Sequence, residues 1–102
     1  MEELTSFQRD ILHVIAGLER PHGLAVKHEL EDYYGKEINH GRLYPNMDQL
    51  SEQGLVNKSK RDERSNTSVI TEPGKKMLAH RHHWEKSYFK PSAKLNAAVR
   101  SD

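Results

Sequence analysis

The chain of 102 residues contains no cysteine. This absence excludes disulfides, thiolate metal sites and thiol-based redox sensing. No apolar run approaches the roughly 18 residues that a membrane-spanning helix requires. The opening segment "MEELTSFQRD" is acidic and polar, so we expect no secretory signal peptide and a cytoplasmic protein.

What the chain does contain fits one small globular domain. It is 34% hydrophobic and 30% charged, a balance that supports a thin core and leaves room for a partner that enlarges it. The four prolines and six glycines are spread along the sequence, so it is not a low-complexity segment.

The net charge of +1 conceals an asymmetry between the two halves of the chain. Residues 1–57 hold 5 Lys and Arg against 10 Asp and Glu, a net charge of −5, whereas residues 58–102 hold 11 against 5, a net charge of +6. A basic segment on a nearly neutral chain is typical of a protein that binds a polyanion. A solvated basic face without a partner is the alternative, and charge alone does not separate the two.

Two amphipathic helices are predicted in the first 35 residues. In "LTSFQRDILHVIAGL" the apolar residues recur at steps of three and four, which predicts a helix that ends near Leu18. Thr5 and Gln8 have the spacing of a capping box and predict its start. The segment "HGLAVKHELEDYYG" has a second helical pattern, which Gly35 ends.

A third helix is predicted between Asn39, a good N-cap, and Gly54, a residue that commonly ends helices. Its apolar residues recur at helical spacing: Leu43, Met47 and Leu50. Pro45 interrupts this pattern, because a proline ring clashes with the carbonyl four residues back and donates no hydrogen bond to it. That carbonyl belongs to Gly41, and we expect the glycine to let the first turn loosen around the proline.

After the third helix the pattern changes to a β-hairpin followed by a last helix. "LVNKSKR" and "TSVIT" predict two strands, and the polar "DERSN" between them predicts the turn. Thr71 can cap a fourth helix with Pro73 in its first turn, where a missing N–H has little cost. We expect this helix to end near Pro91, and residues 91–102 to form a flexible tail.

These elements predict a mainly α fold with a small β-hairpin, the winged helix-turn-helix. Residues 1–72 form the expected DNA-binding domain and residues 73–90 a dimerisation helix. In this architecture the third helix, about residues 39–53, enters the major groove of DNA, and the wing, about residues 58–68, lies on the backbone or minor groove. The basic segment begins in the predicted wing, so charge and topology both favour double-stranded DNA as the partner.

The sequence also resembles the PadR-type transcriptional regulators. "NHGRLYPNMDQLSEQGLV" is similar to the family motif, in which a Tyr-Pro pair lies inside the third helix, and "PHGLAVKHEL" and "ITEPGKKML" are similar to the entry of the second helix and the junction before the last helix. The likeness covers roughly residues 4–90 and is greatest to compact, haloarchaeal members with one dimerising helix. It implies a homodimeric regulator, most often a repressor, on a pseudo-palindromic operator.

Candidate DNA-contacting residues lie at the start of the third helix. Arg42 is predicted to read a base edge, because a guanidinium can bind guanine O6 and N7 together; a phosphate contact is the alternative. His40 and Asn39 lie where backbone N–H groups attract phosphate, although Asn39 can equally serve only as the N-cap. For Tyr44 the family resemblance implies a phosphate contact, with a purely structural ring as the alternative.

Further candidates lie along the third helix and in the wing. Asn46 is predicted to reach a base, whereas Gln49 can reach the DNA backbone. In the wing the candidates combine basic and small polar side chains: Lys60, Arg61, Arg64, Asn66 and Thr67. An arginine inserted into a narrow minor groove and a plain phosphate contact both remain open.

The last helix carries an apolar stripe at near-heptad steps. Its members are Met77, Leu78, Arg81, Trp84, Tyr88 and Phe89. The stripe predicts a two-fold partner helix and therefore a homodimer. Family resemblance adds a possible small-molecule effector held by Trp84 at that interface, and dimer packing alone is the alternative.

Seven histidines raise the question of a metal site, above all in "HRHH". His80 and His83 fall on one helix face, but no carboxylate lies three or four residues away there, and Lys76 would oppose a cation. We therefore predict no metal site and no cofactor, and interpret the cluster as a solvated or titrating face.

The residues fit three classes of function to different degrees. A sequence-specific DNA-binding regulator explains why Arg42, Arg61 and Arg64 occur together on the predicted DNA face. A winged helix used only for protein–protein interaction does not require them. An enzyme is not expected, because no nucleophile–base pair, paired carboxylates or phosphate loop is visible.

Overall fold

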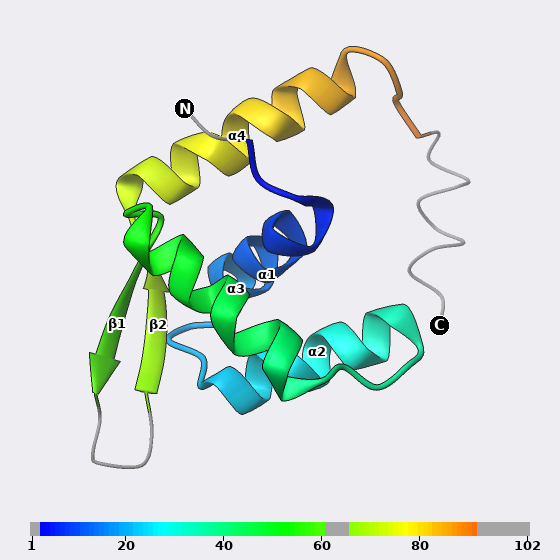
Figure 1. Cartoon of the computed structure of the whole chain (residues 1–102). Helices are drawn as coiled ribbons and strands as arrows, with labels where there is room; N and C mark the ends of the chain where they lie inside the picture. The colour runs from blue at the N-terminus through cyan, green and yellow to red at the C-terminus, as the bar shows by residue number, and fades with distance from the viewer. Residues whose placement is uncertain (1–2, 61–65, 92–102) are drawn as a thin grey trace.

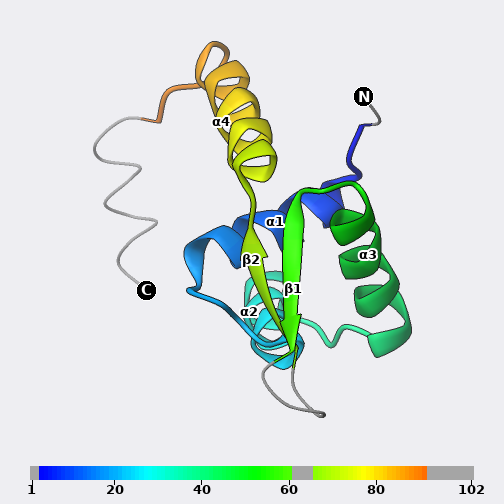
Figure 2. The ribbon, with the colours of Figure 1, turned by 90° about the vertical axis from the view of Figure 1, so that its left-hand side faces the viewer.

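The computed structural model describes residues 3–60 and 66–91 of the chain. Four helices and one hairpin follow in the order α1 (Ser6–Gly17), α2 (Gly23–Tyr34), α3 (His40–Glu52), β1 (Val56–Lys60), β2 (Asn66–Ile70) and α4 (Glu72–Lys86). Figures 1 and 2 show α1 to α3 grouped beside the hairpin, with α4 running across one end of the group. The predicted order of helices and strands, and a mainly α fold with a small β-hairpin, are confirmed.

One hydrophobic core joins the three N-terminal helices to the hairpin. Its largest fully buried side chains come from all of these elements: Ile11, Leu12, Ile15, Val26, Leu30, Leu43, Leu50 and Val56. The apolar residues of α1 and α3 recur at three and four positions, so each helix buries one face and leaves the other to solvent. The core therefore fixes which face of α3 points outward.

The helix ends follow the local signals in the sequence. The Thr5 side chain accepts a hydrogen bond from the Gln8 backbone N–H, and the Gln8 side chain accepts one from the Thr5 N–H, which confirms the capping box. Gly35 and Gly54, both in left-handed conformation with φ of 72° and 77°, follow α2 and α3. Thr71 caps α4 by accepting a hydrogen bond from the Gly74 N–H at 3.2 Å.

The turn between α2 and α3 is held by one carboxylate. Glu31 accepts a hydrogen bond from the Ile38 backbone N–H at 2.8 Å and lies 3.2 Å from the Lys27 ammonium group. The Ile38 hydrogen bond is the main reason why the pKa of Glu31 is lowered, since it favours the charged carboxylate. Ile38 itself is buried, so the start of α3 is tied to the end of α2.

The hairpin is antiparallel and is fastened to the helices at its β2 side. Val56 pairs with Ile70, and the register continues to Lys60 opposite Asn66. Thr67 forms an isolated bridge with His22, and the Ser68 N–H donates to the Pro21 carbonyl at 3.0 Å. These bonds hold the turn-side half of β2 against the segment that enters α2.

The last helix is shorter than predicted. α4 ends at Lys86, five residues before Pro91, and the Ser87 hydroxyl donates to the Trp84 carbonyl at 2.6 Å. This side-chain bond competes with the regular helical bond at the C-terminus, and the residue before a proline disfavours helical conformation. The rest of the predicted tail, residues 92–102, lies outside the described part of the chain.

Candidate nucleic-acid interface

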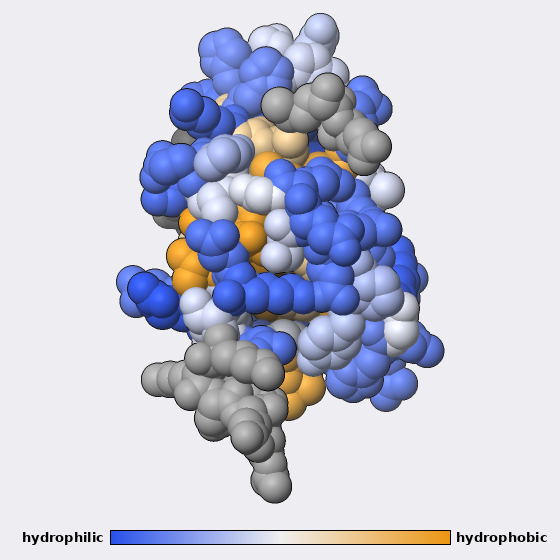
Figure 3. All heavy atoms as spheres, turned by 60° about the vertical axis from the view of Figure 1, so that its left-hand side comes forward, coloured by the Kyte–Doolittle hydropathy of each residue, from blue (hydrophilic) through white to orange (hydrophobic). Residues whose placement is uncertain are grey.

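The outer face of α3 is polar and exposed next to the hairpin. Leu43, Met47 and Leu50 point into the core. The exposed side chains of the helix include His40, Arg42, Tyr44, Asp48 and Gln49. Figure 3 shows the side of the molecule that carries the hairpin, and hydrophilic residues cover most of that surface. A face of this kind suits a polar or charged partner.

The start of α3 is capped and runs through its proline without a break. The Asn39 side chain accepts a hydrogen bond from the Gly41 N–H at 2.6 Å, which makes it the N-cap. The helix is continuous from His40 to Glu52 with Pro45 inside it. Since Pro45 has no N–H, the Gly41 carbonyl cannot receive the regular helical bond from it. Gly41 is exposed, so solvent can take the place of the missing donor.

Tyr44 is fixed between the start of α2 and a histidine. Its ring stacks on the His40 ring with the planes 2° apart and the centroids 5.4 Å apart. On the other side, a Cβ added to Gly23 would lie only 2.6 Å from Tyr44 Cε1 and 2.8 Å from its hydroxyl oxygen. The Tyr44 ring therefore packs against the start of α2. The ring is still 38% exposed.

The hydroxyl of Tyr44 consequently lies beside the N-terminus of α2. The N-cap of that helix, His22, makes no side-chain capping hydrogen bond. The first N–H groups of a helix attract anions when no side chain occupies them. Tyr44 and the start of α2 thus offer hydrogen-bond donors in one place.

Arg42 is exposed but already has a partner within the molecule. Its guanidinium carbon lies 4.0 Å from the centre of the Phe7 ring on α1. An exposed cation–π contact is worth about 0.5–1 kcal/mol. A bidentate contact with guanine contributes about 1–3 kcal/mol of discrimination, so DNA can compete for this side chain.

Asn46 and Gln49 are hydrogen-bonded to the side chain of Gln8 on α1. From the sequence, Gln8 was predicted only as part of the capping box. Gln8 is 5% exposed, and its side-chain N–H groups donate to Asn46 Oδ1 at 3.0 Å and to Gln49 Oε1 at 2.6 Å. Asn46 Nδ2 in turn donates to the Arg42 carbonyl at 2.7 Å. Both amide oxygens therefore face the protein, which limits what these residues can offer to a partner.

The described part of the wing changes one assignment. Asn66 is exposed, as a contact residue requires, but Thr67 is only 5% exposed, and its hydroxyl donates to the Ser59 carbonyl at 3.3 Å. The burial of the Thr67 side chain does not favour the expected contact with DNA, and it leaves Asn66 as the exposed candidate on β2. Lys58 pairs with Asp48 of α3. The Lys60 side chain, Arg61 and Arg64 lie outside the described part of the structure.

The stripe on α4 divides into a covered half and an exposed half. Met77 and Leu78 are half-buried against the core of their own chain, so a partner helix would cover only the part of these side chains that remains exposed. Trp84 is 49% exposed, Tyr88 77% and Phe89 63%. These aromatic side chains are thus left exposed, Trp84 in the last turn of α4 and Tyr88 and Phe89 just after the helix.

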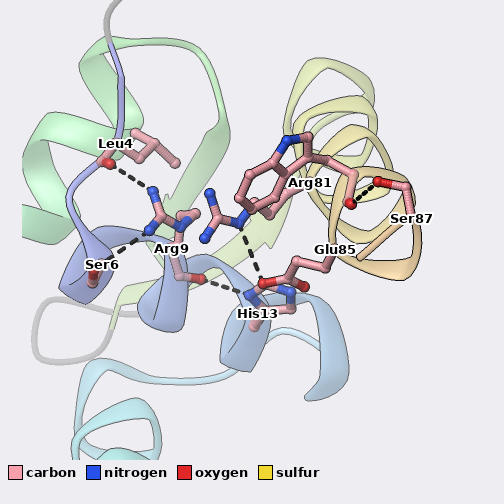
Figure 4. Close-up of polar contacts among 8 residues, drawn as sticks. Leu4, Ser6, Arg9, His13, Arg81, Glu85 and Ser87 are labelled. Carbon is pink, nitrogen blue, oxygen red and sulfur yellow. Dashed lines mark hydrogen bonds and ion pairs between the residues drawn. The ribbon is translucent and has the colours of Figure 1, made fainter. Parts of the chain in front are cut away.

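Polar side chains line the space between α4 and α1. The Arg81 guanidinium lies 4.6 Å from the Trp84 ring and donates to Glu85 at 3.3 Å. Figure 4 shows Arg81 of α4 pointing toward Arg9 on α1, and Glu85 toward His13. Next to them, a groove of about 1310 Å³ runs between the start of α1 and α4. Its apolar lining includes Leu4, Leu55, Met77 and Trp84.

Two further properties concern the residues that the structure describes. Within residues 3–60 and 66–91, no three or more His, Asp or Glu side chains gather as a metal-binding group. None of the described helices has the length and hydrophobicity needed to cross a lipid bilayer.

Comparison with known proteins identifies relatives over most of the chain. The sequence profile described as the transcriptional regulator PadR-like family matches residues 11–80. A solved structure of RosR from H. salinarum is 45% identical, with a TM-score of 0.83, and the match covers 98% of this chain and 90% of that one. A second structure, titled as a complex of RosR, is 46% identical with a TM-score of 0.81, over 96% and 87% of the two chains.

More distant structures share the fold. F93 from STIV, described as a winged-helix DNA-binding protein, is 21% identical with a TM-score of 0.69, over 83% of this chain and 92% of that chain. These likenesses confirm the winged-helix fold. No match was found among curated protein sequences.

Proposed function

The chain belongs to the PadR-like family of transcriptional regulators, and from this premise we propose that it binds double-stranded operator DNA in a sequence-specific way. In this proposal the protein binds as a homodimer and acts as a repressor. A family of transcriptional regulators is not a family of enzymes, in agreement with the sequence interpretation. In the proposed complex α3 enters the major groove, and the hairpin lies on the backbone or minor groove.

The observation that carries this proposal is the polar outer face of α3. The core holds the helix by its three apolar residues, while His40, Arg42 and Tyr44 remain exposed at its N-terminal end. Gly41 and Pro45 lie on the same outer side and are small, so they let a DNA backbone approach closely. Arg42 supplies the base contact, and Tyr44 with the N-terminus of α2 supplies a phosphate contact.

The homodimer is supported by the exposed end of α4. Three large aromatic side chains, Trp84, Tyr88 and Phe89, are left to solvent in the single chain. The groove between α1 and α4 has an apolar lining that the same helix of a second copy can fill. Two copies related by a two-fold axis would place their α3 helices on half-sites about 34 Å apart, which suits a pseudo-palindromic operator.

DNA binding is tested first with the wild-type protein. We expect binding of duplex DNA to weaken steeply with salt, because phosphate contacts release counterions. Selection from a randomised duplex pool should enrich one two-fold symmetric sequence. If the protein does not bind duplex DNA even at low salt, the proposal is overturned and a protein–protein interaction module is favoured.

The repressor role is tested separately. If the protein is a repressor, deleting its gene should raise transcription from promoters that carry the selected sequence.

Dimerisation is tested with Trp84→Glu. We expect this variant to be monomeric in light scattering and to bind the selected duplex at least 10-fold more weakly, because burying a carboxylate in an apolar interface is unfavourable. Tyr33→Glu is the matched control, since Tyr33 is an exposed aromatic residue on α2. A Trp84→Glu variant that stays dimeric would place the interface elsewhere.

The single tryptophan also reports on the interface directly. Dilution of the wild-type protein should shift Trp84 emission to longer wavelength as the dimer dissociates. The same signal tests whether Trp84 holds a small-molecule effector: a ligand that changes emission at constant dimer concentration, and releases DNA, would support it.

A further inference from the structure

We infer that the buried Gln8 is a positioning residue for DNA sequence recognition, because it sets which end of the Gln49 amide faces the major groove. The inference rests on the proposed function, since it takes α3 as the helix that reads DNA. Two backbone groups near Gln8, one donor and one acceptor, have hydrogen-bonding roles that chemistry fixes.

The first group is the Thr5 backbone N–H, which can only donate. It donates to Gln8 Oε1 at 3.1 Å, so the oxygen of Gln8 faces the start of α1. The –NH₂ group of Gln8 must then face α3. It has two hydrogens, and the structure uses them on Asn46 Oδ1 at 3.0 Å and on Gln49 Oε1 at 2.6 Å.

The second group is the Arg42 carbonyl, which can only accept. Asn46 Nδ2 donates to it at 2.7 Å. The Asn46 oxygen is then free to accept from Gln8, so both neighbours require the same orientation of the Asn46 amide. Fixed partners at both ends therefore give one direction to the whole chain of amides. A reversed Asn46 would place its –NH₂ group against the –NH₂ group of Gln8 and its oxygen against a carbonyl.

This arrangement determines which group of the Gln49 side chain can contact DNA. Its side chain is exposed, its oxygen faces Gln8, and its –NH₂ group is the end left for DNA. A glutamine that reads adenine with both ends needs its oxygen and nitrogen on the same base edge. Gln49 instead presents donors, which suit guanine, whose major-groove edge carries two acceptors. Asn46 has both ends engaged within the protein, so the prediction that it reads a base gives way to a supporting role.

The decisive variant is Gln8→Glu. A glutamate keeps the capping box, because its carboxylate still accepts from the Thr5 N–H. It cannot donate, so the Gln49 amide, whose other end has no fixed partner in the protein, should turn its –NH₂ group toward it, and the Gln49 oxygen should then face the DNA. Selection from a randomised duplex pool should show the preferred base in each half-site change from guanine to cytosine, whose edge offers a donor. We expect the change in preference to be about 3- to 10-fold.

Gln49→Glu is the second variant, and it decides the matter if Gln8→Glu does not fold. Its exposed carboxylate still accepts from Gln8 and shows an acceptor to the DNA, so it should lose the guanine preference at the same position. Asn57→Asp is the matched control for the added charge, because Asn57 is an exposed amide on β1 without a bond to Gln8.

The possible results separate the two proposals. Wild-type protein that enriches no sequence would overturn both the proposed function and the role of Gln8. If the wild type enriches a sequence and both glutamate variants enrich the same one with equal base preferences, only the role of Gln8 is overturned. A base change in both variants that Asn57→Asp does not share would establish it.

Discussion

Gly23→Ala is the sharpest test of how Tyr44 is positioned. The new Cβ would lie 2.6 Å from Tyr44 Cε1, 2.8 Å from its hydroxyl oxygen and 3.0 Å from Cζ. Ordinary contacts between carbon atoms are about 3.5–4.0 Å, so the ring must move by about 1 Å. Since Tyr44 is 38% exposed, it can swing toward solvent instead of straining the core. The movement would separate its hydroxyl from the start of α2 and disturb the stack with His40.

The size of the effect follows from the contacts at risk. A hydrogen bond to a charged phosphate is worth about 1.5–3 kcal/mol, and an aromatic stack about 0.5–1.5 kcal/mol. Losing part of both should cost about 1–3 kcal/mol, or roughly 5- to 150-fold in affinity. The free energy of unfolding should change little, because alanine favours a helix over glycine by up to about 1 kcal/mol and offsets the crowding.

The assay is fluorescence anisotropy with the duplex that the wild-type protein selects, alongside thermal unfolding. Gly17→Ala is the matched control, because nothing lies within 4 Å of its added Cβ. In a Tyr44→Ala background the crowding is gone, so Gly23→Ala should weaken binding no further. An equal loss of affinity in both backgrounds would refute the reasoning and show that Gly23 acts on DNA binding without Tyr44.

Three other substitutions have distinct expected outcomes. Pro45→Ala should hold or raise the thermal midpoint, because it restores a helical N–H, and should weaken the DNA complex by re-aiming the start of α3; lower stability with intact binding would make Pro45 a packing residue. Arg42→Ala should cost about 1–3 kcal/mol on the selected duplex and relax preference at one base position, and an equal loss on random DNA would make Arg42 a phosphate contact. Burial, and then the hydrogen bond to Asp10, raises the pKa of Tyr34 to about 12 from its ordinary value of 10.0. The folded state therefore retains the phenol proton more strongly, and this stabilisation should be present below pH 10 and lost between about pH 10 and 12; denaturant unfolding of Tyr34→Phe should lack that loss.

The sequence by itself determined the helices, their ends and the order of elements. Capping at Thr5 and Asn39, and the glycine stops after α2 and α3, depend on residues within a few positions of one another. Apolar periodicity is likewise a local property, and it identified which side of α3 is buried. The Tyr-Pro pair inside a helical pattern was distinctive enough to indicate the family. The end of α4 was placed too late, because the hydrogen bond from Ser87 that competes with the helix leaves no pattern in the sequence.

Only the tertiary structure decided what the polar residues of α3 can offer to DNA. Gln8 lies 38 and 41 positions from the two amides that it orients, so no periodicity could connect them. The contact of Arg42 with Phe7 and the packing of Tyr44 on Gly23 likewise join separate helices. Such contacts depend on how the core sets the helices against one another, and on side-chain directions that a linear pattern does not contain. For the same reason, Thr67 was predicted as a contact residue because it is a small polar residue in the wing, whereas its position in the folded hairpin leaves it buried.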